Sequence, residues 1–215
     1  MASGAESKRL GIAVELHNIA HTFKSRPVFN PVSIQWPAGS ECLIRGANGS
    51  GKSTLGRIVA GELIPEQGSV HWSHEGERID PDALCMLSYR VSPISALHPQ
   101  LSIAELVAFQ EQFRPWASRG LAEELLKAAG LTPHRNKAFR DLSSGMQQRV
   151  KLALALASDA GLIVLDEPCA NLDTSGVAWY REALHELRGT ATLVICSNDR
   201  EQDFIDPDFT LKLDT

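Results

Sequence analysis

Two stretches of the chain, residues 162–165 and 191–196, are apolar at every position except one threonine, without alternation of polar and apolar side chains. Parallel strands that are covered on both faces have this pattern. Between them, residues 174–188 place their apolar side chains on one helical stripe, and Gly189 follows as a stop. We therefore predict a right-handed strand–helix–strand crossover in a parallel sheet, with the apolar segment 42–45 as a further core strand.

The middle of the chain has helical signals instead. Ser102 and Glu105 have the spacing of a capping box, which opens a helix to about Phe113. A second helix is expected over residues 121–129, with Gly130 closing it. We predict an inserted α-helical subdomain over about residues 95–145, followed by a buried helix over 150–157.

Near the start, residues 11–23 and 28–34 are rich in β-branched side chains and are bounded by prolines. This pattern predicts a small antiparallel β subdomain. Residues 1–9 are expected to be a flexible lead-in, and residues 10–215 a single α/β domain.

Composition excludes several classes of protein. The 215 residues are 43% hydrophobic and 22% charged, as in an ordinary globular domain and unlike a disordered chain or a coiled coil. The net charge of −5 and the lack of a basic patch argue against nucleic acid as a partner. Apolar runs are too short to span a membrane, and no secretion signal is visible, so we expect a cytoplasmic protein. The four cysteines show no CxxC spacing and are expected to be reduced and buried.

The strongest chemical signal is a glycine-rich segment between a predicted strand and a predicted helix. It matches G-x-x-x-x-G-K-[ST] and consists of Gly46, Ala47, Asn48, Gly49, Ser50, Gly51, Lys52 and Ser53, with Thr54 next. Glycines let successive backbone N–H groups surround a phosphate at the start of a helix. We expect Lys52 to reach the β- and γ-phosphates of a nucleotide and Ser53 to bind Mg²⁺.

Two acidic residues end the strand over 162–165. Asp166 is expected to hold Mg²⁺, directly or through water, and Glu167 to polarise the attacking water as general base. Together with the phosphate loop, these residues predict a P-loop NTPase of the RecA-like fold.

Two further motifs complete a resemblance to a family. Leu-Ser-Ser-Gly-Met-Gln-Gln-Arg stands at 142–149, and Ala-Asn-Leu-Asp stands at 170–173. With the phosphate loop and Asp166-Glu167-Pro168, in this order and spacing, the chain resembles the ATP-binding-cassette (ABC) ATPases over about residues 10–215. The resemblance implies ATP and Mg²⁺ as cofactors.

The resemblance also assigns roles to single residues. It implies that Ser143, Ser144, Gly145 and Met146 form a signature motif that contacts the γ-phosphate of ATP bound to the opposite subunit. It implies that Asp173 communicates across that dimer and that Phe23 stacks on adenine, although an aromatic residue in a small β region can also be a core residue. Because each chain has one phosphate loop and one signature, it must pair with a second copy or with a paralogous cassette.

The sequence departs from the family pattern at several positions. Ser144 replaces the second signature glycine, and Met146 replaces the signature glutamine. Asn198 stands at the position of the switch histidine, and an amide cannot become cationic, so hydrolysis is expected to be slow. Ser92 or Pro93 stands where the Q-loop glutamine is expected, which puts coupling to a partner in doubt.

The favoured function is the ATP-hydrolysing subunit of an ABC transporter, peripheral on the cytoplasmic face of the membrane. A separate permease would dock near residues 91–100, and the Ser-Ser-Gly-Met signature is similar to that of haem exporters of cytochrome c maturation. Alternatives are a soluble ABC ATPase that acts on a macromolecular assembly, and a degenerate cassette that binds ATP as a switch. Transported substrate and direction of transport do not follow from the sequence.

Two other candidates have plain explanations. We interpret His71 and His74, in a strand-turn segment, as a solvated surface pair. Cys169 has no base beside it in the sequence and is expected to have a packing role.

Overall fold

A computed structural model describes residues 9–213 of the chain. Its core is a five-stranded sheet with the order β11-β5-β10-β9-β8, in which every neighbouring pair is parallel. The strands of this sheet are β5 (Glu41–Arg45), β8 (Ser88–Val91), β9 (Leu162–Asp166), β10 (Thr192–Ser197) and β11 (Phe209–Lys212). All residues of β9 and β10 are buried, which confirms the prediction that their continuous apolar runs are covered on both faces.

A second, antiparallel sheet is formed mostly by the first third of the chain. Its order is β4-β1-β6-β7, from β1 (Ala13–Ala20), β4 (Val32–Trp36), β6 (Gln67–His74) and β7 (Glu77–Ile79). The predicted antiparallel subdomain is thus confirmed, but the second strand begins at Val32 and not at residue 28. The segment before it holds a two-stranded hairpin, β2 (Thr22–Phe23) with β3 (Arg26–Pro27).

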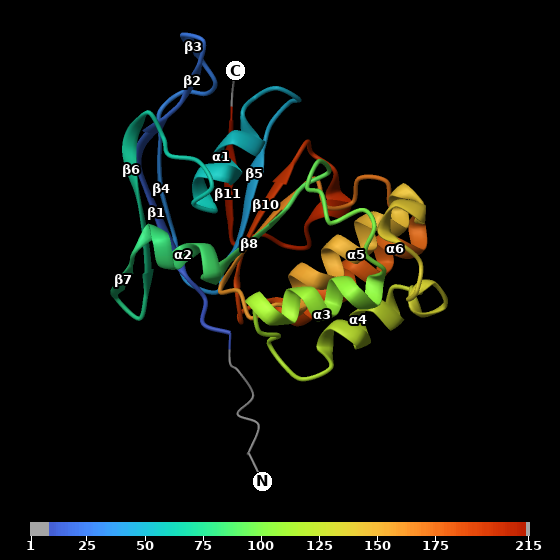
Figure 1. Cartoon of the computed structure of the whole chain (residues 1–215). Coiled ribbons are helices and arrows are strands. Elements are labelled where there is room, and N and C mark those ends of the chain that lie inside the picture. The colour runs from blue at the N-terminus through green and yellow to red at the C-terminus, as the bar shows by residue number, and fades with distance from the viewer. Residues whose placement is uncertain (1–8, 214–215) are drawn as a thin grey trace.

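The helices divide between the two faces of the parallel sheet. The α-helices are α1 (Lys52–Val59), α2 (Pro81–Leu87), α3 (Ile103–Phe113), α4 (Leu121–Ala128), α5 (Ser144–Ala157) and α6 (Thr174–Leu187). Short 3-10 turns lie at η1 (Thr132–His134), η2 (Phe139–Asp141) and η3 (Glu201–Asp203). Figure 1 shows α1 between the two sheets, with α3 to α6 on the opposite side of the parallel sheet.

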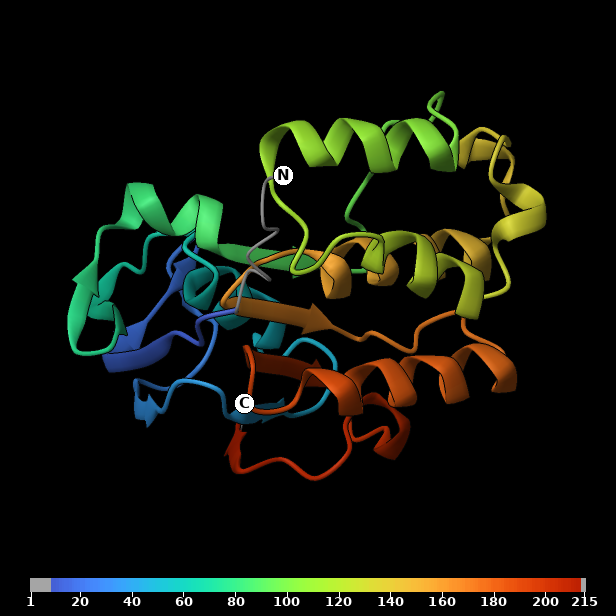
Figure 2. The same ribbon diagram turned by 90° about the horizontal axis from the view of Figure 1, so that it is seen from below.

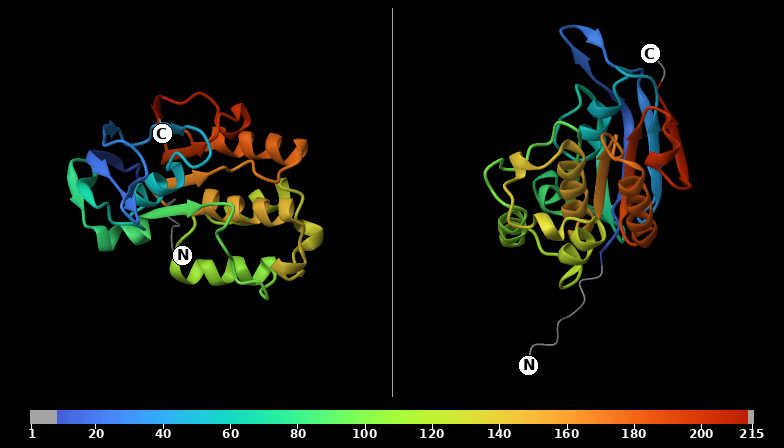
Figure 3. Two further views of the ribbon diagram at one scale, coloured as in Figure 1. Left: turned by 90° about the horizontal axis from the view of Figure 1, so that it is seen from above. Right: turned by 90° about the vertical axis from the view of Figure 1, so that its right-hand side faces the viewer.

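Two hydrophobic cores follow from this layering. One joins the antiparallel sheet, α1 and one face of the parallel sheet, and the other joins the second face to α3, α4, α5 and α6. Figure 2 and the left view of Figure 3 both show α5 between α3 and α6. α5 is therefore the central helix of its side, as the apolar segment 150–157 predicts, but it begins six residues earlier than that segment, at Ser144.

The inserted helices begin as the sequence indicates. The Ser102 hydroxyl accepts the backbone N–H of Glu105, whose carboxylate accepts the backbone N–H of Ser102, so the predicted capping box opens α3. After α4, Gly130 has φ 74°, a left-handed conformation that suits glycine at a helix end. No helix within residues 9–213 has both the length and the apolar character needed to cross a membrane.

Candidate nucleotide-binding site

The phosphate loop connects β5 to α1, as predicted. Gly46 has no room for a side chain, because a Cβ atom there would lie 2.6 Å from both the Ser50 hydroxyl and the Leu213 carbonyl oxygen. Gly51 has φ 93°, and its Cβ would lie 2.6 Å from side-chain atoms of Val28 and Phe29. These two glycines therefore let the loop wrap tightly onto its neighbours.

Polar groups of the loop are arranged for an anion. The buried Lys52 ammonium donates hydrogen bonds to the carbonyl oxygens of Gly46 (2.7 Å) and Ala47 (2.9 Å) across the loop. The Ser50 hydroxyl is buried and has no hydrogen-bond partner within residues 9–213. Residues 47–49 form the exposed tip, and Ser53 and Thr54 lie in the first turn of α1. A buried cation, an unpartnered hydroxyl and a helix N-terminus together suit a bound phosphate chain.

Asp166 is at the end of β9 and is 5% exposed. Burial raises the pKa of its carboxyl group, while a hydrogen bond from Ser53 and the charges of Arg90 and Lys52 act in the opposite direction. The hydrogen bond between Ser53 and Asp166 joins the two predicted metal ligands. A hydroxyl together with a carboxylate is a set of oxygen ligands that Mg²⁺ prefers. These residues fit the metal.

Glu167 follows directly and is half-buried. Its backbone has a positive φ of 46°, which is uncommon for a residue with a side chain. The backbone N–H of Glu167 donates to the Cys196 carbonyl oxygen (2.9 Å) and the Glu167 carbonyl accepts from Ala170. The chain therefore turns sharply at Glu167, immediately after the strand that carries Asp166.

Asn198 follows β10, which lies between β5 and β9, so it is at the same edge of the sheet as the phosphate loop and Asp166. Its amide nitrogen is 3.4 Å from the side-chain oxygen of Asn48 in the loop tip. Its amide oxygen is buried and has no hydrogen-bond partner in the described part of the chain. The asparagine thus lies within reach of the phosphate loop.

A buried carboxylate that the sequence analysis missed supports this edge. Asp203 is fully buried and accepts hydrogen bonds from the Ser197 hydroxyl (2.6 Å) and from the backbone N–H of Cys169 (3.1 Å). It therefore connects the segment after Glu167 to the segment that carries Asn198. The only sequence signal is an acidic residue five positions beyond Asn198.

The signature residues line a different cavity, of about 410 Å³, and no residue of the phosphate loop is among those that line it. Ser143 caps α5 by accepting the backbone N–H of Met146 (3.2 Å), and Ser144 begins the helix. A Cβ atom on Gly145 would lie 2.7 Å from the Asn171 carbonyl oxygen, so a side chain does not fit there.

Asp173 lies beside this cavity and caps α6. Its carboxylate accepts hydrogen bonds from the backbone N–H of Gly176, the Ser175 hydroxyl and the Arg149 guanidinium. The bond from Gly176 is the largest cause that lowers the pKa of Asp173, so the group is held as a carboxylate. The structure thus brings the signature segment and Asp173 together.

Phe23 lies in the hairpin of β2 and β3 and is 52% exposed, so it is not a core residue. It packs edge-to-face against His21, with ring centroids 4.9 Å apart. Phe23 lines a cavity of about 410 Å³ together with Gly49 of the phosphate loop. An exposed aromatic ring therefore lies next to the loop, where the resemblance expects the adenine.

Ser92 and Pro93, at the expected Q-loop position, begin a tight turn after β8. The Ser92 backbone N–H donates to the Ser95 hydroxyl (3.0 Å), and the Ser95 N–H donates back to the Ser92 carbonyl (3.1 Å). Both carbonyl oxygens, of Ser92 and of Pro93, accept hydrogen bonds from the buried Lys151 on α5. Lys151 is not among the predicted site residues, although a lysine within the apolar segment 150–157 is a visible signal.

The cysteines and histidines have modest roles. Cys169 is buried and burial is the first cause that raises its pKa, which fits a packing role. Cys42 and Cys196 are also buried, but the expectation of burial is wrong for Cys85, which is exposed in the short helix α2. His71 and His74 do not pair with each other: His71 contacts Ser69 and His74 contacts the Gly11 carbonyl.

Comparison with known proteins agrees with this geometry. The family model described as "ABC transporter" matches residues 29–170. The cytochrome c biogenesis ATP-binding export protein CcmA of Paramagnetospirillum magneticum is 32% identical over 183 residues, which cover 84% of each chain. The Fe(3+) ions import ATP-binding protein FbpC of Pseudomonas fluorescens is 33% identical over 197 residues, and the match covers 88% of this chain but only 55% of that relative.

Solved structures show the same fold. A bacterial Atm1-family ABC exporter with ATP bound superposes with a TM-score of 0.79 at 24% identity, over 94% of this chain and 37% of that one. The ATP-binding subunit of an ABC transporter gives a TM-score of 0.78 at 21% identity, over 93% and 85% of the two chains. On the family match and the relatives above 30% identity, the chain belongs to the ABC transporter family, as an ATP-binding-cassette domain.

Proposed function

We propose that this chain is an ATP-binding and ATP-hydrolysing subunit that drives a separate membrane permease. The observation that carries the proposal is the contact between Ser53, which follows the phosphate-loop lysine, and Asp166, which precedes Glu167. This contact joins a nucleotide cradle to a buried carboxylate that suits Mg²⁺.

The residues divide the chemistry among them. Backbone N–H groups of residues 46–51 and the Lys52 ammonium bind the phosphates of ATP, and Ser53 and Asp166 hold Mg²⁺, which neutralises phosphate charge when bound. The Glu167 carboxylate orients a water molecule and accepts its proton. Phe23 offers its exposed ring to the adenine base.

Asn198 supplies a neutral hydrogen-bond donor at this site. An amide stabilises developing charge on a phosphate less than an imidazolium does, so we propose that turnover is slow. The same observation favours a second candidate function, in which the cassette binds ATP as a switch with little or no turnover. The half-buried Glu167, immediately after Asp166, favours hydrolysis over that alternative.

The separate location of the signature cavity supports pairing. Ser143, Ser144 and Gly145 present a helix N-terminus, which attracts anions, but they line a cavity without phosphate-loop residues. We propose that two cassettes face each other, so that each signature meets the ATP on the partner's phosphate loop. The partner is a second copy of this chain or a paralogous cassette.

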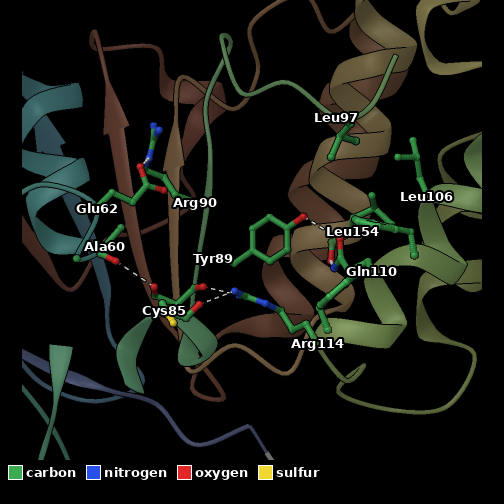
Figure 4. A pocket seen from close by; sticks show the side chains of 14 residues that line it. Ala60, Glu62, Cys85, Tyr89, Arg90, Leu97, Leu106, Gln110, Arg114 and Leu154 are labelled. Carbon is green, nitrogen blue, oxygen red and sulfur yellow. Dashed lines mark hydrogen bonds and ion pairs between the residues drawn. The ribbon is translucent and has the colours of Figure 1, made fainter. Parts of the chain in front are cut away.

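A large cleft supports docking of a permease. It has a volume of about 660 Å³ and lies between α2, β8 and α3 (Figure 4). Phe109 and Phe113 of α3 line it and are 52% and 59% exposed, although aromatic rings are usually buried. Of residues 91–100, where docking was predicted, only Leu97 lines the cleft.

The polar floor of the cleft is already paired within the chain. The Tyr89 hydroxyl donates to Gln110 (2.9 Å), the Arg114 guanidinium donates to the carbonyls of Cys85 and Ser88, and Arg90 pairs with Glu62 at 2.7 Å (Figure 4). A partner therefore meets mostly apolar side chains. An amphipathic helix of a permease fits this chemistry, and it would hold the chain on the cytoplasmic face of the membrane.

The decisive experiment uses Glu167→Gln. This variant keeps the shape of the site but removes the base, so we expect it to bind ATP, to lose hydrolysis and to accumulate as a dimer. Light scattering after size exclusion in saturating Mg-ATP measures the mass. Lys52→Ala, which loses the phosphate contact, should stay monomeric under the same conditions, and a monomeric Glu167→Gln protein would contradict the paired site.

A further inference from the structure

Lys151 is a buried cation near the start of the segment 150–157 of α5, whose other residues are all apolar and buried. It is 7% exposed and lies in α5 between Val150 and Leu152, both of which are fully buried. Its ammonium lies 3.1 Å from the Ser92 carbonyl oxygen and 3.1 Å from the Pro93 carbonyl oxygen. No carboxylate within residues 9–213 lies close enough to form an ion pair with it.

This position is energetically unfavourable for a lysine unless its contacts are made. Burial in apolar surroundings disfavours the charged ammonium and lowers its pKa. The two carbonyl oxygens compensate for part of this cost, and they come from a segment 58 and 59 residues earlier in the chain. A leucine or an alanine would pack at this position without such a requirement, so the lysine is specific to the contact with the turn.

The turn that Lys151 holds is compact. Ser92 and Ser95 bond each other through backbone and hydroxyl groups, which fixes the backbone between them. This turn continues β8, whose last residue, Val91, is in register with Leu165 beside Asp166. In the other direction it leads to Leu97 at the wall of the cleft. The turn therefore lies between the metal-binding strand and the proposed docking cleft.

α5 connects Lys151 to the signature. The helix begins at Ser144, and Lys151 is six residues beyond Gly145, which corresponds to about 9 Å along the axis. Continuous backbone hydrogen bonds make a helix of this length a stiff element. A displacement of the signature end is therefore transmitted to the lysine, and through two hydrogen bonds to the turn.

We propose that Lys151 is a positioning residue that makes the Ser92–Ser95 turn and the signature helix move as one unit, in a chain that has no glutamine at the Q-loop position. The cleft and the nucleotide site are then coupled through α5 and the backbone of the turn. This inference rests on the proposed function, because it assumes that ATP displaces the signature segment.

The test is hydrogen exchange of backbone amides in Glu167→Gln protein, with and without Mg-ATP. The variant Lys151→Met is added to this background, because it keeps the apolar stem and removes the donor. Lys127→Met is the matched control, since Lys127 is an exposed lysine on the neighbouring helix α4. Two segments are followed, residues 92–98 and residues 143–150.

In the Glu167→Gln protein, which is the parent here, and in its Lys127→Met control, we expect ATP to slow exchange in both segments. In Lys151→Met, ATP should still protect residues 143–150 but should leave residues 92–98 unchanged. A purely structural role would speed exchange in both nucleotide states without separating the two responses. If ATP protects residues 92–98 equally in Lys151→Met and in the parent, the coupling is overturned.

The result also separates this inference from the proposed function. If the parent shows no ATP response at residues 143–150 and stays monomeric, the paired-site function fails. The comparison without nucleotide then tests whether Lys151 anchors the turn. If it does, the backbone amides of residues 92–95 should exchange at least about tenfold faster in Lys151→Met. Equal rates would overturn it. If Lys151→Met does not fold, Lys151→Leu, which also removes the donor and is apolar like its neighbours, replaces it in both comparisons.

Discussion

The buried carboxylate of Asp166 suits Mg²⁺ binding but lowers the stability of the metal-free protein. Burial raises its pKa, so the folded chain holds this proton to a higher pH than the unfolded chain does. As pH rises from the ordinary range of an aspartate, near 3.9, through the folded pKa, the free energy of unfolding falls. Above the folded pKa, the protein without metal therefore bears the full cost of the buried charge.

Asp166→Asn should remove that cost. We expect the metal-free variant to be more stable by about 0.5–2 kcal/mol at neutral pH, and to lose less stability as pH rises above the ordinary range of an aspartate. Mg-ATP, which should raise the melting temperature of the parent, should no longer do so. Thermal unfolding over a pH series measures both effects, and Asp141→Asn, at an exposed site, is the control. A variant less stable than the parent at neutral pH would refute this explanation.

At the scale of elements, the end of β10 is held in place by the buried group of Ser197, Asp203 and Cys169. The Ser197 hydroxyl donates to Asp203 at 2.6 Å and accepts the Arg200 N–H at 3.2 Å. The Asp203 carboxylate also accepts the backbone N–H of Cys169. The Tyr180 hydroxyl donates to the backbone carbonyl oxygen of Asp203 (2.7 Å). This group fixes Asn198 relative to Glu167, because Asn198 directly follows Ser197 and Glu167 lies two residues before Cys169.

Ser197→Ala should weaken both folding and catalysis. The variant leaves a buried carboxylate short of one donor, which costs about 1–3 kcal/mol of stability. We expect a lower kcat with little change in the KM for ATP, since the phosphate loop is untouched. Urea unfolding and steady-state kinetics measure the two effects, with Ser69→Ala, at an exposed position of β6, as the control. An unchanged urea midpoint would show that the group does not hold the strand end.

Sequence patterns predicted elements with strong local signals and missed those that depend on distant partners. Strands β9 and β10 follow from continuous apolar runs, and α3 follows from its capping box. The edge strand β11 alternates between half-buried and exposed positions over four residues, and it is a strand only because β5 lies beside it. Arg90, Lys151 and Asp203 were missed for the same reason, since each acts through residues 28 to 59 positions away.

The whole molecule carries both halves of a composite site but not in contact with each other. Two inactive variants should therefore complement each other. Lys52→Ala lacks a functional phosphate loop, and Gly145→Asp adds a carboxylate at the signature, where even a Cβ atom would lie 2.7 Å from the Asn171 carbonyl oxygen. In a mixed dimer, one of the two sites is intact.

An equal mixture should recover up to about a quarter of the parent ATPase rate, because half of the dimers are mixed and each has one intact site. Steady-state hydrolysis of each variant alone and of the mixture measures this, with Glu167→Gln as the background rate. If the mixture stays at the rate of the separate variants while the parent is active, the sites are not shared between chains.

The strand order of the parallel sheet determines when the nucleotide site can form during synthesis. β5 leads into the phosphate loop, but its two neighbours, β10 and β11, begin at Thr192 and Phe209. A ribosome that has released the first 190 residues has thus made the phosphate loop without either strand that supports it. The nascent chain must wait for its last strands before it can bind ATP, and such late, long-range pairing makes folding slow and exposes an apolar strand in the meantime.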